Sequence, residues 1–182
     1  SALRLAEEGV LIGEQVGGTY YFHPDELVSR DQFVALAMHT VGLEALEGVT
    51  VTGFADDAAI PTWAKGYVSS ALKSGLVQGT VSEAGVVFEG ERPITKAEAS
   101  VLLDRMLQVT DASVTTLFPD LDTTPTWAYQ AAVNLETVGV LQTAADGSLG
   151  LSDTLTRADA ADMLCGALEL LEAREASGWL PW

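Results

Sequence analysis

The stretch FADDAAIPTWAKGYVSSALKSGLV at residues 54–77 decides the fold, because a second copy, FPDLDTTPTWAYQAAVNLETVGVL, follows at residues 118–141. The two copies align without a gap at an offset of 64 residues (118 − 54), with Phe, Asp, Pro, Trp and Gly in the same phase. The N-terminal SALRLAEEGVL supplies the second half of a third copy, in which Gly9 matches Gly75 and Gly139. Repetition at a fixed period predicts a repeated structural unit.

A second block follows each glycine, and its copies are FHPDELVSRDQF (22–33), FEGERPITKAEA (88–99) and LGLSDTLTRADA (149–160). Its basic residues, Arg30, Lys96 and Arg157, are 66 and 61 residues apart (96 − 30 and 157 − 96). The spacing predicts three units at residues 1–48 (truncated at its start), 49–112 and 113–176, followed by a tail at 177–182.

Each unit has the pattern of two helices. The first is predicted at about 62–74 and 126–138, with Pro61 or Pro125 blocking N-terminal extension, a threonine cap at Thr62 or Thr126, and a glycine stop. The second begins at the hydroxyl residue before each basic residue and has apolar residues at helical spacing. Short pieces at 19–22 and 86–88 are candidate small strands. We therefore expect an all-α fold with at most short β pieces.

The units must pack together, because no segment of this size buries much core alone. Three units are few for an open solenoid, whose ends need capping repeats. We expect three helix–loop–helix units to close into a pseudo-threefold bundle within a single monomeric chain.

The composition excludes several classes of function. The 182-residue chain carries a net charge of −17, which disfavours nucleic acid and anionic membrane surfaces as partners. No apolar run reaches the length of a membrane span, so no membrane insertion is expected. The one cysteine, Cys165, rules out an internal disulfide and is predicted to be a small core residue. His23 and His39 lack metal-ligand spacing, so we expect no metal and no cofactor.

The hydroxyl residues are predicted to be helix caps. Ser29, Thr95 and Thr156 precede their helices, and the residues three positions later (Gln32, Glu98 and Asp159) complete the capping-box pattern. Asp56 and Asp120 follow a phenylalanine by two residues, where an Asx turn or a cap is the expected structural role.

Capping does not explain Arg30, Lys96 and Arg157, which fall at the first helical position, where the helix dipole disfavours cations. Two explanations stay open. Each cation, with nearby backbone N–H groups, recognises an anion, or each forms a salt bridge between repeats. Trp63 and Trp127 also recur, and each is either a core anchor or a platform for a sugar ring.

Together these motifs resemble the S-layer homology (SLH) repeat over nearly the whole chain. ITKAE at 94–98 and LTRAD at 155–159 are similar to that family's Thr–Arg–Ala–Glu signature. The resemblance implies a pseudo-trimeric helical bundle that anchors proteins at the bacterial cell surface. Its ligand would be an anionic, often pyruvylated, cell-wall polysaccharide held in grooves between repeats. It also implies that the ligand contacts are Arg30, Lys96, Arg157, Trp63 and Trp127.

The first unit departs from the signature, with VSRDQ at 28–32 and no matching Trp. We therefore expect Lys96 and Arg157 to be the strongest contacts and Arg30 the weakest, since Asp31 adds a neighbouring negative charge. The leading function is a non-catalytic wall anchor. The alternatives are a protein-interaction module that keeps the fold without a glycan ligand, and a glycosidase. Acidic pairs are the only feature that favours catalysis, and in so acidic a chain they are expected as solvated surface.

Overall fold

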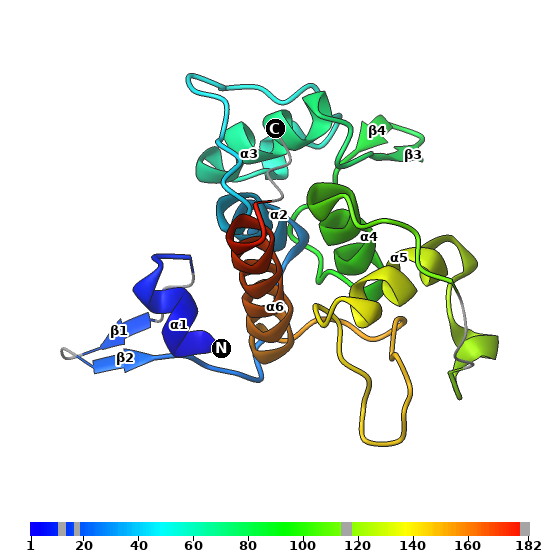
Figure 1. The fold of residues 1–182 in the computed structure, drawn as a ribbon. Coiled ribbons are helices and arrows are strands. Elements are labelled where there is room, and N and C mark those ends of the chain that lie inside the picture. Colours follow the sequence, from blue (N-terminus) through cyan, green and yellow to red (C-terminus); the bar gives the residue numbers. More distant parts are fainter. Residues whose placement is uncertain (11–13, 17–18, 114–117, 179–182) are drawn as a thin grey trace.

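The computed structural model describes residues 1–10, 14–16, 19–113 and 118–178, and it is mainly helical with two small hairpins (Figure 1). This confirms the predicted all-α class with short β pieces. Trp179 and Trp182, in the predicted tail, lie outside the described residues. The helices are α1 (Ala2–Glu7), α2 (Arg30–Thr40), α3 (Thr62–Lys73), α4 (Lys96–Leu107), α5 (Thr126–Thr137) and α6 (Arg157–Ala176).

The strands form two separate antiparallel hairpins. The first pairs β1 (Glu14–Val16) with β2 (Thr19–Tyr21), and the second pairs β3 (Thr80–Ser82) with β4 (Gly85–Val87). Short 3-10 turns at Asp57–Ala59 and Leu121–Thr123 precede α3 and α5. No helix within the described residues is both long and apolar enough to cross a bilayer.

Three backbone hydrogen bonds close the chain into a ring. The N–H of Val28 donates to the carbonyl of Leu155 (3.0 Å), that of Leu155 to Ile94 (2.8 Å), and that of Ile94 to Val28 (3.0 Å). Each of these residues lies two positions before one of the three signature cations, as we call Arg30, Lys96 and Arg157. The side chains of the three residues are buried in the common core. This cyclic pattern joins the starts of α2, α4 and α6, as a closed bundle requires and an open stack does not.

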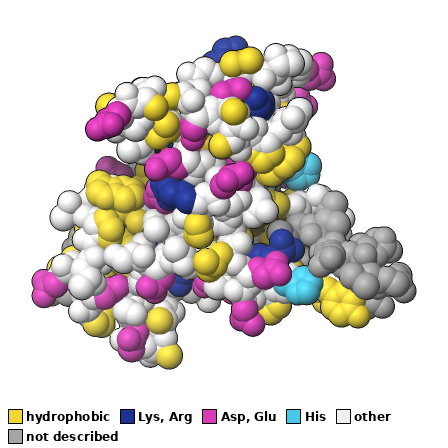
Figure 2. Space-filling view, turned by 180° about the vertical axis from the view of Figure 1, so that it is seen from behind, with side chains coloured by type: hydrophobic (Ala, Val, Ile, Leu, Met, Phe, Trp, Pro, Cys, Tyr) yellow, Lys and Arg dark blue, Asp and Glu magenta, His cyan; other side chains and the backbone are white. Residues whose placement is uncertain are grey.

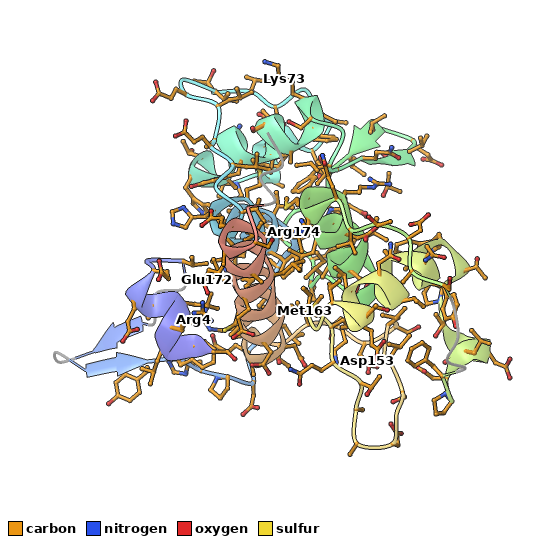
Figure 3. The ribbon with its side chains drawn as sticks, viewed as in Figure 1. Arg4, Lys73, Asp153, Met163, Glu172 and Arg174 are labelled. Carbon is orange, nitrogen blue, oxygen red and sulfur yellow. The ribbon has the colours of Figure 1, made fainter. Side chains whose placement is uncertain are left out.

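The helices follow the same cyclic order. The helices that carry the signature, α2, α4 and α6, pack against one another at the centre, with α3 against α2, α5 against α4 and α1 against α6. Arg4 on α1 points toward α6 (Figure 3), where its guanidinium contacts Glu172 at 2.6 Å and Glu169 at 3.0 Å. These contacts thus join α1, in the first segment of the chain, to α6, the last helix.

The outer helices end in the same way. Gly9, Gly75 and Gly139 follow α1, α3 and α5 with φ near +70° (72°, 70° and 78°), a conformation in which a Cβ is disfavoured. After each glycine, the next residue donates back into the helix: Val10 to Leu5, Leu76 to Ala71 and Val140 to Leu135. These are Schellman caps, and they explain the predicted glycine stops.

The predicted threonine caps of α3 and α5 are wrong by one position. Thr62 and Thr126 are already the first helical residues, while Pro61 and Pro125 occupy the cap position without a side-chain cap bond. Pro61 has an extended ψ of 145°, and its carbonyl accepts from Ala64 and Lys65. The proline itself therefore sets the start of the helix.

Candidate functional site

The three predicted capping boxes are present. Each hydroxyl accepts from the backbone three residues on: Ser29 from Gln32 (3.4 Å), Thr95 from Glu98 (3.3 Å) and Thr156 from Asp159 (3.1 Å). In return, each side chain at that third position accepts the backbone N–H of the cap residue. The caps fix the first turns of α2, α4 and α6, and so set where the adjoining cations point.

The backbone around the cations is already engaged. The first helical N–H groups donate to carbonyls of another segment: Arg30 to Arg92 (2.9 Å), Lys96 to Asp153 (2.9 Å) and Arg157 to Glu26 (2.7 Å). The idea that these amides face an anion alongside the cations is therefore wrong. Because these amides already donate to carbonyls of another segment, the cations themselves would have to meet a ligand through their side chains.

Arg30 lies in a largely buried position between α2 and α4. Its Nη1 is 3.1 Å from Oε1 of Glu98, its Nη2 donates to the carbonyl of Gln78 at 3.0 Å, and its guanidinium stands over the Phe88 ring. Within the described part of the chain, its buried Nε has no hydrogen-bond partner. Burial lowers the pKa of Arg30, although the charge of Glu98 opposes this shift.

Glu98 is shared between two arginines. Arg92 also contacts this carboxylate, donating from Nη1 at 2.7 Å and from Nη2, in a forked arrangement. Burial disfavours the ionised form of Glu98, but the hydrogen bond from Arg92 and the other contacts outweigh it and lower the pKa of Glu98. Glu98 therefore meets two cations, and Arg92 has a further, longer ion pair with Glu89 at 3.5 Å.

An open pocket of about 230 Å³ adjoins these groups. We call it the Arg30 pocket; its lining consists of Arg30, Val34, Leu76, Val77, Gln78, Thr80, Arg92, Ile94, Glu98, Val101, Leu102, Arg105 and Trp127. Three of the chain's nine basic residues thus face a pocket with one acidic residue, in a protein of net charge −17. Figure 2 shows acidic side chains scattered over one face of the molecule and basic ones sparse.

Trp127 gives this pocket an aromatic wall. The residue is 61% exposed and Trp63 is 52% exposed, so neither is a core anchor, and the sugar-platform alternative remains a prediction. Trp127 belongs to the third predicted unit and Arg30 to the first, so the structure pairs the cation with a Trp from another unit. The Trp-based reason for ranking Arg30 last assumed pairing within a unit, which this lining does not follow, while the ranking itself stays a prediction. Moreover, the Asp31 carboxylate is buried and accepts from the backbone of Gln32 at 2.8 Å.

Lys96 lies in a different environment. Its Nζ is 3.4 Å from Oδ1 of Asp159, and it borders a smaller pocket of about 60 Å³, the Lys96 pocket. That lining is Lys96, Val140, Leu141, Gln142, Asp159, Asp162 and Met163. It holds two acids against one cation, and no Trp stands among these described residues.

Arg157 is held against the first unit. Its Nε donates to the carbonyl of Phe22 at 2.7 Å, and its guanidinium lies 5.3 Å from the centre of the Phe22 ring. Arg30 over Phe88 is the equivalent arrangement. The ion pairs of Arg30 with Glu98 and of Lys96 with Asp159 link different predicted units. The salt-bridge explanation of these two cations therefore has direct structural support.

Asp56 and Asp120 are structural residues, but not through the predicted local bonds. The Asp56 carboxylate accepts the N–H groups of Phe88 (2.8 Å) and Glu89 (2.7 Å), and Asp120 accepts those of Leu149 (3.0 Å) and Gly150 (2.8 Å). Each aspartate therefore ties the start of its unit to the loop before the next signature helix. Charged acceptors make such bonds stronger than neutral ones.

Sequence reasoning missed Arg92 and Arg105. The signal for Arg92 was its phase: at the position four residues before the signature cation, the other units carry Glu26 and Asp153. A cation there occurs in the second unit alone. Arg105, which donates to the carbonyl of Leu76 at 3.3 Å, gave no repeat signal, because His39 and Gly166 stand in its phase.

Comparison with known proteins gives a family match over part of the chain. Residues 53–100 match the S-layer homology domain, so this part of the chain carries the domain that the sequence motifs predict. The matched segment contains α3, the second hairpin, Arg92 and the start of α4.

Three curated proteins are similar over half of the chain or slightly less. An amylopullulanase of Thermoanaerobacterium thermosulfurigenes is 31% identical over 88 residues, which is 47% of this chain and 5% of that protein. Exoglucanase XynX of Acetivibrio thermocellus is 30% identical over 88 residues, 47% of this chain and 8% of that protein. A surface-layer 125 kDa protein of Lysinibacillus sphaericus is 26% identical over 92 residues, 50% of this chain and 8% of that protein. The similarity thus spans less than a tenth of each relative.

Proposed function

We propose that this protein is a non-catalytic module that anchors an attached protein to the bacterial cell wall. It acts outside the cell and binds an anionic secondary cell-wall polysaccharide. The observation that carries the proposal is the Arg30 pocket, where three arginines and an exposed Trp meet one acid in a strongly acidic chain. The S-layer homology match supports a cell-wall anchoring role.

The relatives support a module rather than a catalytic domain. Two are named as enzymes, an amylopullulanase and an exoglucanase, and the third as a surface-layer protein. Similarity over about 90 residues to each of these different proteins, at 5% to 8% of their length, fits an accessory function that all of them can use.

The pocket suits an acidic sugar. Arginine heads donate forked, charge-assisted hydrogen bonds to carboxylates such as that of a pyruvate ketal. An indole ring offers an apolar face to the C–H face of a sugar, as Trp127 could do at the pocket wall. Because the net charge repels anions at long range, affinity must come from these close contacts.

A second candidate function is a protein-interaction module without a glycan ligand. The ion pair of Lys96 with Asp159 favours it, because a predicted contact cation instead joins two units. Arg30 and Arg92 are also paired, but the exposed Arg105 leaves donors beside the pocket.

Co-sedimentation with purified bacterial sacculi tests the proposal. The wild-type protein should pellet with intact sacculi and stay in solution once the wall polysaccharide has been extracted. Arg105→Ala should weaken pelleting, whereas Lys73→Ala, at the exposed outer end of α3 (Figure 3), should not. Equal pelleting before and after extraction, or equal effects of the two variants, would contradict it.

A further inference from the structure

The three signature cations stand in unequal electrostatic surroundings, and the difference traces to one repeated position. The repeated position lies four residues before each signature cation. The carbonyl at this position accepts the backbone N–H of the signature cation of the neighbouring segment in the ring. That residue is Arg92 for Arg30, Asp153 for Lys96 and Glu26 for Arg157. This backbone bond fixes the neighbour beside the cation whatever its side chain, so the side chain is free to set the charge.

Beside Arg30, the residue at the repeated position is Arg92, which competes with Arg30 for the Glu98 carboxylate. Arg92 holds both oxygens of Glu98 in a fork, so the carboxylate that would otherwise neutralise Arg30 is shared with a second cation. The Arg30 pocket has three cations and one acid in its lining. The lining has a net formal charge of +2 before Glu89, whose carboxylate lies 3.5 Å from Arg92 Nε, is counted.

Beside Lys96, the residue at the repeated position is Asp153, a carboxylate that competes with an anionic ligand for Lys96. A Cβ placed on Gly150 would lie 2.8 Å from an Asp153 carboxylate oxygen and 3.8 Å from Lys96 Nζ, which puts this carboxylate near Lys96, although it lines the neighbouring pocket and not the Lys96 pocket itself. Asp159 pairs directly with Lys96, and Asp162 joins the lining. With one cation and two acids, the Lys96 pocket has a net formal charge of −1 before Asp153 is counted.

We infer that the residue at this position decides which pocket accepts an anion, so that Arg92 makes the Arg30 pocket a binding site and Asp153 closes the Lys96 pocket to anions. The inference rests on the proposed function, because it assigns the anionic polysaccharide to one of the pockets between segments. Arg92 acts here as a specificity-determining residue. Removal of one charge-assisted contact weakens binding on the order of tenfold.

The two pockets have separate spectroscopic reporters. Trp127 lines only the Arg30 pocket of the two, and Met163 only the Lys96 pocket. Met163 and Asp153 are marked in Figure 3. Protein carrying 5-fluorotryptophan and methyl-¹³C methionine would be titrated with polysaccharide released from sacculi. The resonances would be assigned through Trp127→Phe and Met163→Leu.

In the wild type, the Trp127 signal should move on titration and the Met163 signal should stay. Arg92→Asp should weaken the Trp127 response on the order of tenfold or more in apparent affinity. Asp153→Arg should give Met163 a response of its own. Asp153 is exposed, so this gain does not depend on the fold tolerating a buried change. Adding Asp162→Val to Asp153→Arg should enlarge that gain, because this second change copies Val101 of the Arg30 pocket. Glu83→Arg, with the same charge change on the exposed β3–β4 turn, serves as the control and should leave Met163 silent.

The outcomes distinguish the role of Arg92 and Asp153 from the proposed binding of wall polysaccharide. A Met163 response in the wild type, or its absence in both Asp153→Arg and the double variant with Asp162→Val, overturns the inference while binding itself stands. A Met163 response in Glu83→Arg also overturns it, because net charge alone would then account for the gain. Absence of any shift in the wild type, with no pelleting on sacculi, would instead overturn the proposed function.

Discussion

Arg30 and Glu98 are 68 positions apart in the sequence, and Nη1 of the arginine lies 3.1 Å from Oε1 of the glutamate. The same carboxylate caps the backbone of Thr95 and holds Arg92 in a fork. Glu98 therefore caps the start of α4, joins two segments and supplies the one acidic residue in the lining of the Arg30 pocket. The fold and the candidate site depend on one side chain.

Replacing Glu98 by Gln should cost stability. Glutamine preserves the capping-box geometry, as Gln32 shows in α2, but it leaves Arg30 with an uncompensated charge in a site where its side chain is only 14% exposed. The free energy of unfolding should fall by about 1–3 kcal/mol, measured by urea denaturation. Glu91→Gln, at an exposed position, is the matched control. A loss no larger than that of the control would argue against the central role of Glu98.

The threonine caps of α4 and α6 should be measurable individually. Thr95→Ala and Thr156→Ala each remove the acceptor for a backbone N–H, and each should destabilise the protein by about 0.5–2 kcal/mol. Thr62→Ala removes a hydroxyl at a helix start that makes no side-chain cap bond, and should change little. Thermal midpoints that are the same for all three variants would contradict the assignment of caps.

Local features of the chain were predictable and contacts between segments were not. The capping boxes and glycine stops depend on residues within four or five positions of one another, so the sequence pattern reveals them. The pairing of Arg30 with Trp127, and of Asp56 with the backbone of Phe88, depends on which segment lies beside which in the closed ring. Repetition predicted the ring but not this order, so the sequence did not reveal that Arg30 and Trp127 line one pocket.

Stability at acid pH should depend on Asp57. The Nζ of Lys65 donates to its carboxylate at 2.6 Å, and Thr52 donates from its backbone and its hydroxyl. These bonds lower the pKa of Asp57 from its ordinary value of 3.8 to about 2. A depressed pKa contributes stability that is present above the unfolded pKa and is lost as the pH falls through the folded value.

The wild type should therefore lose this contribution between about pH 4 and pH 2, and Asp57→Asn should have a flatter profile over that interval. Thermal unfolding at a series of pH values measures it, with exposed Asp25→Asn as the control. Parallel profiles for Asp57→Asn and the wild type would show that the Lys65 contact does not contribute.

Trp127→Ala should separate binding from folding. Because the side chain is 61% exposed, its removal should leave the thermal midpoint almost unchanged. Loss of an aromatic anchor at a binding site costs about 2 kcal/mol, so affinity for released wall polysaccharide should drop roughly thirtyfold. Trp63→Ala, outside the lining of the Arg30 pocket, is the comparison. An equal or larger loss for Trp63→Ala would move the binding site to another pocket.

The central claim is that anion recognition resides at Arg30 rather than at Lys96. The most direct test is isothermal titration of released wall polysaccharide into Arg30→Gln and Lys96→Gln, with circular dichroism to establish that both variants are folded. We predict that Arg30→Gln weakens binding tenfold or more, and that Lys96→Gln binds within about twofold of the wild type. Wild-type affinity for Arg30→Gln, or an equal loss for Lys96→Gln, would contradict the account.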